Sequence, residues 1–220
     1  MKRTAPIERE YGPFPGVDKV HGVSYDGRQV WLAGGDALHA LDPASGELTR
    51  TLPIEASAGT AFDGRHLYQI AGRSIRRIDP ASGAVLATIP APAEGCSGMA
   101  WAEGSLWVGE YAANHIHRVD PATGAVLCTL ATTRHVTGVT WLGDELWHGT
   151  WEGEASDLRR IDPASGALLD TLELPQGVGV SGLESDGRDR LFCGGGSSGK
   201  LRVVRRSRDV ANAQDADAPA

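Results

Sequence analysis

The sequence has 220 residues, of which 41% are hydrophobic and 22% charged, and its formal net charge is −7. The length suits a single domain. The acidic balance and the absence of a basic stripe argue against nucleic acid as a partner. No apolar run approaches the roughly 20 residues that a membrane-spanning helix needs, so we expect no membrane partner.

The first residues, "MKRTAPIEREYGPFPG", contain a basic pair but no apolar stretch of the kind that a secretory signal requires. The three cysteines, Cys96, Cys128 and Cys193, show no CxxC spacing. Unpaired thiols of this kind are typical of a reducing compartment. We therefore predict a cytoplasmic protein.

A repeated pattern runs along the chain from residue 21 to residue 206. Its first half occurs five times, as "HGVSYDGRQVWLAGG", "AGTAFDGRHLYQIAG", "SGMAWAEGSLWVGEY", "TGVTWLGDELWHGTW" and "SGLESDGRDRLFCGG". Its second half occurs four times, as "LDPASGELTRTL", "IDPASGAVLATI", "VDPATGAVLCTL" and "IDPASGALLDTL". A period of about 40 residues indicates an array of supersecondary units.

Each unit predicts four short strands, because apolar and polar residues alternate between turn signals. Four-stranded sheets at this period are typical of propeller blades. The fifth unit ends after its third strand, and the segment 7–14 resembles a fourth strand. We therefore predict an all-β, five-bladed β-propeller whose N-terminal segment closes the last blade. The expected blades are 17–54, 55–91, 92–131, 132–174 and 175–206, followed by a disordered tail, 207–220.

Four aspartates, Asp42, Asp79, Asp120 and Asp162, begin the repeated Asp-Pro-Ala-Ser/Thr-Gly phrase. Pro suits the second position of a type I turn, Asp accepts hydrogen bonds from the N–H groups ahead, and Gly tolerates positive φ. We interpret them as hairpin residues between the third and fourth strands rather than as a shared site.

The loops at one mouth of the central channel are the expected place for function. They are longest in blades three and four, in "GEYAANH" and "HGTWEGEASD". The candidate acid/base or metal-binding groups are Glu110, His135 and His148. The candidate ligand-binding residues are His21, Cys96, Tyr111, Trp151 and Glu152.

Other conspicuous residues receive a structural interpretation. His115 and His117 alternate along a third strand and are expected to face solvent. Cys128 is expected in an outer strand without a reactive role. One aromatic position recurs in all units and is expected in the core between blades: Trp31, Tyr68, Trp107, Trp147 and Phe192.

Unit three, "SLWVGEYAANHIHRVDPATGAV", resembles the repeat of the virginiamycin B lyase propellers, with its W-x-x-E and N-x-I-x-R-[IV]-D-P-x-T-G pattern. The residues that match are Trp107, Glu110, Asn114, Ile116 and Asp120. This resemblance implies a propeller that opens a cyclic depsipeptide by metal-assisted elimination.

Units four and five resemble the five-bladed glutaminyl-peptide cyclotransferases of plant and bacterial type. The matching residues are Gly138, Gly143, Asp144, Leu146, Thr150, Trp151, Asp186 and Gly187. That family has a glutamate where this chain has Thr137, and a Ser-Asp pair where it has Gly194-Gly195. The resemblance implies a five-bladed fold and cyclisation of glutaminyl peptides.

We therefore expect an enzyme that processes a small molecule or a peptide at the channel mouth, of lyase, cyclotransferase or hydrolase type. The alternative is a non-catalytic propeller that binds a metabolite or a protein on the same face. Convergent histidines and carboxylates would favour catalysis, whereas an aromatic patch without them would favour binding. A divalent metal cofactor and the oligomeric state are left open.

Overall fold

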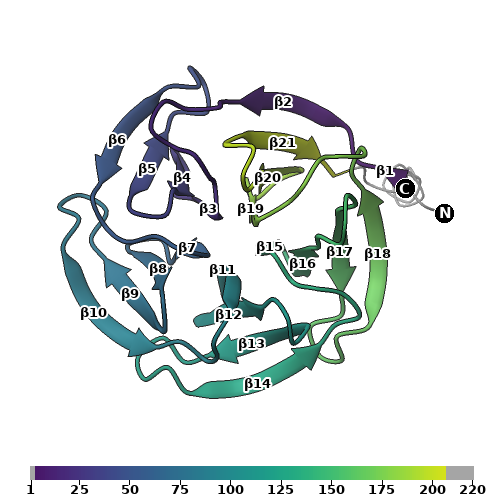
Figure 1. The fold of residues 1–220 in the computed structure, drawn as a ribbon. Coiled ribbons are helices and arrows are strands. Elements are labelled where there is room, and N and C mark those ends of the chain that lie inside the picture. Colours follow the sequence, from purple (N-terminus) through teal and green to yellow (C-terminus); the bar gives the residue numbers. More distant parts are fainter. Residues whose placement is uncertain (1–2, 207–220) are drawn as a thin grey trace, which may run out of the picture.

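The computed structural model describes residues 3–206, which form five mainly antiparallel sheets arranged around an axis as a five-bladed β-propeller (Figure 1). This confirms the predicted fold class. The described residues contain strands and turns but no helix, and hence no helix able to cross a membrane. The predicted tail, 207–220, lies outside the described residues.

From blade one to blade five, the chain starts each sheet at the innermost strand and runs outward (Figure 1). Blade one contains β3 (Gly22–Tyr25), β4 (Val30–Ala33), β5 (Leu38–Leu41) and β6 (Leu48–Leu52). Blade two contains β7 (Thr60–Phe62), β8 (Leu67–Ala71), β9 (Ser74–Ile78) and β10 (Val85–Pro90). Blade three contains β11 (Cys96–Ala102), β12 (Ser105–Glu110), β13 (His115–Val119) and β14 (Val126–Ala131). Blade four contains β15 (Val139–Leu142), β16 (Glu145–Gly149), β17 (Asp157–Ile161) and β18 (Leu168–Glu173). Blade five contains β19 (Gly182–Ser185), β20 (Arg190–Gly194), β21 (Leu201–Arg205) and, from the N-terminal segment, β2 (Ile7–Tyr11).

The hydrophobic core is divided into five clusters, one at each seam between neighbouring blades. Each seam holds one member of the recurring aromatic position, and all five side chains are buried: Trp31, Tyr68, Trp107, Trp147 and Phe192. Their assignment to the core between blades is confirmed. Because every sheet is packed on both faces, the second and third strands have little surface left for solvent.

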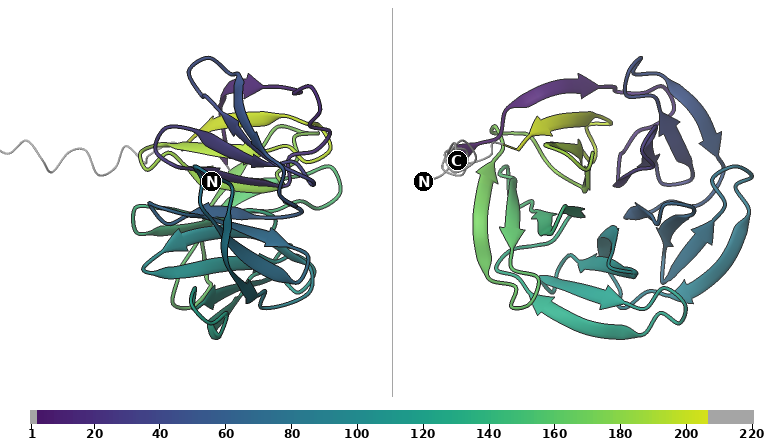
Figure 2. Two further views of the ribbon diagram at one scale, coloured as in Figure 1. Left: turned by 90° about the vertical axis from the view of Figure 1, so that its left-hand side faces the viewer. Right: turned by 180° about the vertical axis from the view of Figure 1, so that it is seen from behind.

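The N-terminal segment closes the ring, as predicted. β2 pairs antiparallel with β21 and so becomes the outer strand of blade five (Figure 1). The Tyr11 hydroxyl donates to the Pro43 carbonyl oxygen at 2.7 Å, which ties β2 to the blade-one hairpin. An additional strand was not predicted: β1 (Arg3–Thr4) pairs parallel with β18, so blade four has five strands. Residues 3–11 therefore link blades four and five across their seam (Figure 2).

The repeated aspartates are turn residues, as predicted. In blade three the Asp120 carboxylate accepts the N–H groups of Ala122 at 2.8 Å and Thr123 at 2.9 Å. The N–H of Gly124, whose φ is +79°, closes the turn on the Asp120 carbonyl oxygen at 2.9 Å. Asp42, Asp79 and Asp162 accept hydrogen bonds in the same way. The four carboxylates thus order four separate hairpins and do not converge.

Candidate functional site

A cavity of about 310 Å³ lies at one mouth of the central channel. All five blades contribute to its wall through one equivalent position of the repeat. In each blade this position lies two residues before the first core residue of the innermost strand. These residues are His21, Ala58, Ser97, Thr137 and Ser181. The fivefold repeat therefore turns one sequence position into a ring around a single site. We call this site the axial cavity.

A ring of five glycines follows directly after that position: Gly22, Gly59, Gly98, Gly138 and Gly182. Each packs against the backbone of the next blade. A Cβ atom added to Gly98, for example, would lie 2.5 Å from the Gly138 Cα atom. The innermost strands are in backbone contact at this level, and no side chain larger than hydrogen fits. The axial cavity thus lies above a constriction.

Two serines of the axial cavity fix the spacing of neighbouring blades. The Ser97 hydroxyl donates to the Val136 carbonyl oxygen at 2.6 Å, across the seam between blades three and four. The Ser181 hydroxyl donates in the same way to the Val20 carbonyl oxygen, across the seam between blades five and one. Bonds between blades at the rim make the cavity a preformed feature of the fold.

Tyr111 and Trp151 form an aromatic wall on the blade-three and blade-four side of the axial cavity. The Tyr111 hydroxyl donates to the Trp151 carbonyl oxygen at 3.3 Å. The Trp151 indole N–H donates to the Gly153 carbonyl oxygen at 3.0 Å, which orients its ring. The ring lies so close to blade five that a Cβ atom on Gly179 or Gly196 would approach it within 2.9 Å.

His135 supports this wall from behind and does not line the axial cavity. Its ring stacks on Tyr111, with ring centroids 4.6 Å apart and planes 28° apart. Its Nδ1 atom lies 2.9 Å from the Asn114 amide oxygen. His135 is therefore placed to position Tyr111, whereas Tyr111 itself faces the cavity.

No Asp, Glu, Lys or Arg lines the axial cavity within the described part of the chain. Burial, and secondarily the charge of Lys19, lower the pKa of His21, so its imidazole is neutral near pH 7. Burial raises the pKa of the Cys96 thiol; the Ala93 carbonyl oxygen opposes this effect and the Glu110 charge adds to it. The cavity therefore presents a neutral base and a protonated thiol beside hydroxyl groups.

The structure does not bring His148 to the axial cavity. The sequence placed it at the start of a loop, but β16 continues to Gly149 and the His148 side chain is fully buried inside the sheet. Its Nδ1 atom lies 3.2 Å from the Gly149 carbonyl oxygen, and Nε2 has no hydrogen-bond partner. Burial lowers its pKa to about 4, so His148 is neutral at physiological pH.

Glu152 also lies outside the cavity lining. Its carboxylate is 2.9 Å from an Arg134 guanidinium nitrogen, and Arg134 also contacts Asp157 at 2.8 Å. The Glu152 carboxylate is therefore paired with Arg134 and is not available to the axial cavity.

Of the eight candidate residues named from the sequence, the structure places four in the axial cavity: His21, Cys96, Tyr111 and Trp151.

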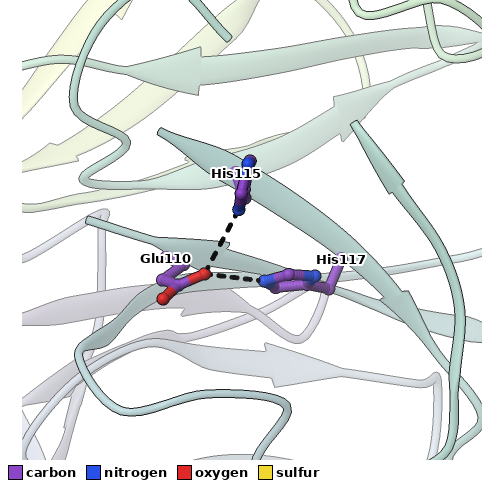
Figure 3. A group of neighbouring side chains, drawn as sticks. All are labelled: Glu110, His115 and His117. Carbon is purple, nitrogen blue, oxygen red and sulfur yellow. Dashed lines mark hydrogen bonds and ion pairs between the residues drawn. The ribbon is translucent and has the colours of Figure 1, made fainter. Parts of the chain in front are cut away.

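Glu110 lies beside the axial cavity and faces a different group. Its carboxylate contacts His115 and His117, and one ligand atom from each of the three residues lies within 4.8 Å of the others (Figure 3). The expectation that His117 faces solvent is wrong, because its residue is only 7% exposed. It lies on the same face of blade three as its register partner Val108, and that face packs against blade two. A signal was present in the sequence, since blade three alone combines these three residues at these repeat positions.

Glu184, on β19, is a second ionisable group that sequence reasoning missed. Its carboxylate accepts hydrogen bonds from the Thr140 hydroxyl at 2.6 Å and the Ser185 N–H at 2.8 Å. Burial nevertheless raises its pKa to about 7. Glu184 does not line the axial cavity.

No protein-family model matches the chain, and no curated protein matches it in sequence. Among solved structures, Myxococcus xanthus glutaminyl cyclase superimposes with a TM-score of 0.75 at 18% identity, over 93% of this chain and 97% of that one. The Cps50 (Swd1) β-propeller domain of Myceliophteria thermophila gives a TM-score of 0.59 at 10% identity, over 92% of this chain and 100% of that one. The WD40 propeller domain of Doa1 gives a TM-score of 0.56 at 16% identity, over 87% of this chain and 64% of that one. The resemblance to virginiamycin B lyases stays a prediction. What these structures share with the present protein is the β-propeller fold.

Proposed function

We propose that this protein binds a small uncharged molecule in the axial cavity. The observation that carries the proposal is the convergence of one repeat position from all five blades on a single cavity. Its volume, about 310 Å³, is at the lower end of the range of small-molecule sites. Such a ligand would also be held by the flat faces of Tyr111 and Trp151.

The lining explains why the ligand should be uncharged. A buried ion without a partner is costly, and no side chain of opposite charge from the described residues faces the axial cavity. Hydroxyl groups and the His21 imidazole instead supply neutral hydrogen-bonding groups. An amide, a neutral nucleoside or a sugar has the matching chemistry.

Binding is testable by filling the cavity. Ala58 is the smallest member of the ring, and Ala58→Phe would occupy the ligand's space. The control is Ala84→Phe, on an exposed position of the same blade. A thermal-shift screen with neutral nucleosides, monosaccharides and N-acetyl amino-acid amides should give a compound that stabilises the wild type and Ala84→Phe but not Ala58→Phe. Equal stabilisation of all three proteins would exclude the axial cavity as the site.

A second candidate function is cyclisation of an N-terminal glutaminyl residue. It is supported by the likeness to Myxococcus xanthus glutaminyl cyclase over nearly the whole of both chains, and by the neutral His21 imidazole in the cavity. In this reaction His21 would accept a proton from the substrate α-ammonium group. The freed amine would then attack the side-chain carboxamide carbon, forming a C–N bond while the original C–N bond breaks and ammonia leaves with a proton from the attacking nitrogen.

Glutaminyl-alanine amide distinguishes the two functions. Catalysis predicts loss of one ammonia by mass spectrometry at a rate above the spontaneous reaction. It also predicts that His21→Ala abolishes this rate while His66→Ala, which alters a histidine outside the axial cavity, preserves it. No ammonia release above the spontaneous rate would exclude cyclisation and leave binding of an uncharged molecule as the function. A protein ligand at the same face and a cytoplasmic location remain proposals from the sequence.

A further inference from the structure

We propose that Glu110, His115 and His117 form a site for one divalent transition-metal ion, with Zn²⁺ the best match. The register of blade three creates the site, because Glu110 on β12 pairs directly with His115 on β13. His117 lies two residues further along β13 and therefore on the same face of the sheet. Figure 3 shows both imidazole rings directed at the Glu110 carboxylate.

The distances suit a tetrahedral ion. Glu110 Oε2 lies 3.1 Å from His117 Nε2 and 3.4 Å from His115 Nδ1. Zn²⁺ binds nitrogen and oxygen at about 2.0–2.2 Å, which separates neighbouring tetrahedral ligand atoms by roughly 3.4 Å. The three side chains are thus near the required positions. Two imidazoles favour Zn²⁺ over Mg²⁺ and Ca²⁺, which prefer all-oxygen sites.

A hydrogen bond outside the ligand set orients His117. Its Nδ1 atom lies 2.9 Å from the Thr129 hydroxyl. When Nδ1–H donates to this hydroxyl, the lone pair of Nε2 faces Glu110, which is the tautomer that a metal ligand requires. The His117 side chain is 9% exposed, whereas that of His115 is 38% exposed. One ligand is therefore rigidly held, and the other leaves an entry path for the ion and for water as a fourth ligand.

The repeat shows that blade three is unusual at this place. In three other blades the residue equivalent to His117 is an arginine paired with a carboxylate: Arg76 with Glu55, Arg159 with Asp157, and Arg202 with Glu10. In blade three His117 takes the arginine position, and its carboxylate partner is Glu110 on β12, which also contacts the second imidazole, His115. No Lys or Arg between residues 3 and 206 forms an ion pair with Glu110 in the structure. The Glu110 carboxylate thus faces two imidazole rings, and these three groups can bind a metal ion together.

Blade one provides a natural control. His39 is equivalent to His117, and its Nδ1 atom lies 3.0 Å from the Thr51 hydroxyl in the same arrangement. The residues equivalent to Glu110 and His115 are Gly34 and Ala37. A single buried histidine without the other two ligands should not bind the ion.

The proposed metal site adjoins the axial cavity but does not depend on a ligand there. Cys96 lines the cavity and is the register partner of Glu110 across β11 and β12. The row Cys96, Glu110, His115 therefore runs outward from the cavity wall through three neighbouring strands. The metal would lie one strand away from the cavity.

Calorimetric titration of tag-free, EDTA-treated full chain with ZnCl₂ tests the proposal. We expect one equivalent of Zn²⁺ to bind, no binding of Mg²⁺, and at least about a 100-fold weaker affinity in Glu110→Gln and His115→Ala. Thr129→Val should weaken binding by about 10-fold, as expected for a residue that orients a ligand. His39→Ala should leave it unchanged.

Glu110→Gln is nearly isosteric and His115 is partly exposed, so both variants should fold, which circular dichroism verifies. Absence of one-equivalent Zn²⁺ binding in the wild type would overturn the proposal. Unchanged binding in both variants would do the same, and its loss in Cys96→Ser would then assign the ion to a thiol. A Co²⁺-loaded wild type with the intense visible bands of tetrahedral cobalt, absent from Glu110→Gln, would support the assigned ligands.

Discussion

The ionisation of Glu184 should make the protein less stable as the pH rises. Burial raises the pKa of this carboxyl group from 4.5 to about 7 despite its hydrogen bonds from Thr140 and Ser185. A difference of one pH unit corresponds to about 1.4 kcal/mol, so the elevation amounts to roughly 3 kcal/mol of the free energy of unfolding. Glu184→Gln keeps the shape and removes the ionisation.

The sign follows from proton binding. Below pH 4.5 Glu184 is protonated in both the folded and the unfolded chain and contributes no difference. Between pH 4.5 and about 7 the unfolded chain releases this proton while the folded chain retains it, so stability falls as the pH rises. Above about pH 7 the whole penalty is present.

Urea unfolding followed by tryptophan fluorescence measures this effect. The stability of Glu184→Gln relative to the wild type should rise by about 3 kcal/mol between pH 4.5 and pH 8.5. Glu47→Gln, at an exposed position, should show no comparable change. If the wild type and Glu184→Gln instead keep a constant difference in stability across this range, the carboxyl group is not held in its neutral form by burial.

Three further variants test other parts of the structure by the same unfolding assay. Burial lowers the pKa of His148 to about 4, so stability is lost as the pH falls from 6.5 to 4. His148→Gln should reduce this acid loss by roughly 3 kcal/mol, and an unchanged loss would contradict its buried, neutral state. Gly98→Ala should cost about 3 kcal/mol or more through overlap with the next blade, against about 1 kcal/mol for Gly104→Ala, where positive φ is the only obstacle. Similar losses at both glycines would disprove the tight ring. Tyr11→Phe removes the bond to Pro43 and should cost about 1 kcal/mol; no loss would show that this bond does not help to close the ring.

Features that depend on the period were predictable from the sequence. The recurring aromatic position identified one core residue at each of the five seams, and the missing fourth strand of the last unit pointed to the segment that supplies it. Four of the eight candidate residues line the axial cavity, because the blade-to-blade loops and the loops after the second strands meet at one mouth.

Features that depend on contacts between blades were not predictable in the same way. Alternation along β13 suggested a solvent face for His117, but the neighbouring blade covers that face. The length of β16 could not be read from "HGTW", so buried His148 was mistaken for a loop residue. Among the described residues, the pairing of β1 with β18 involves Arg3 and Thr4, and two residues carry no strand pattern.

The composite fifth blade has a consequence for the order in which the protein can form during synthesis. Blades one to three can pair their own strands as soon as they leave the ribosome. β2, in contrast, is made long before its partner: Glu10 and Arg202, which bond across β2 and β21, are 192 positions apart. The pairing of β2 that closes the ring must therefore wait until the last described strand, β21, has been made. Pairing over such a separation is slow, and until β21 has been made and has paired, β2 is an unpaired strand exposed to aggregation.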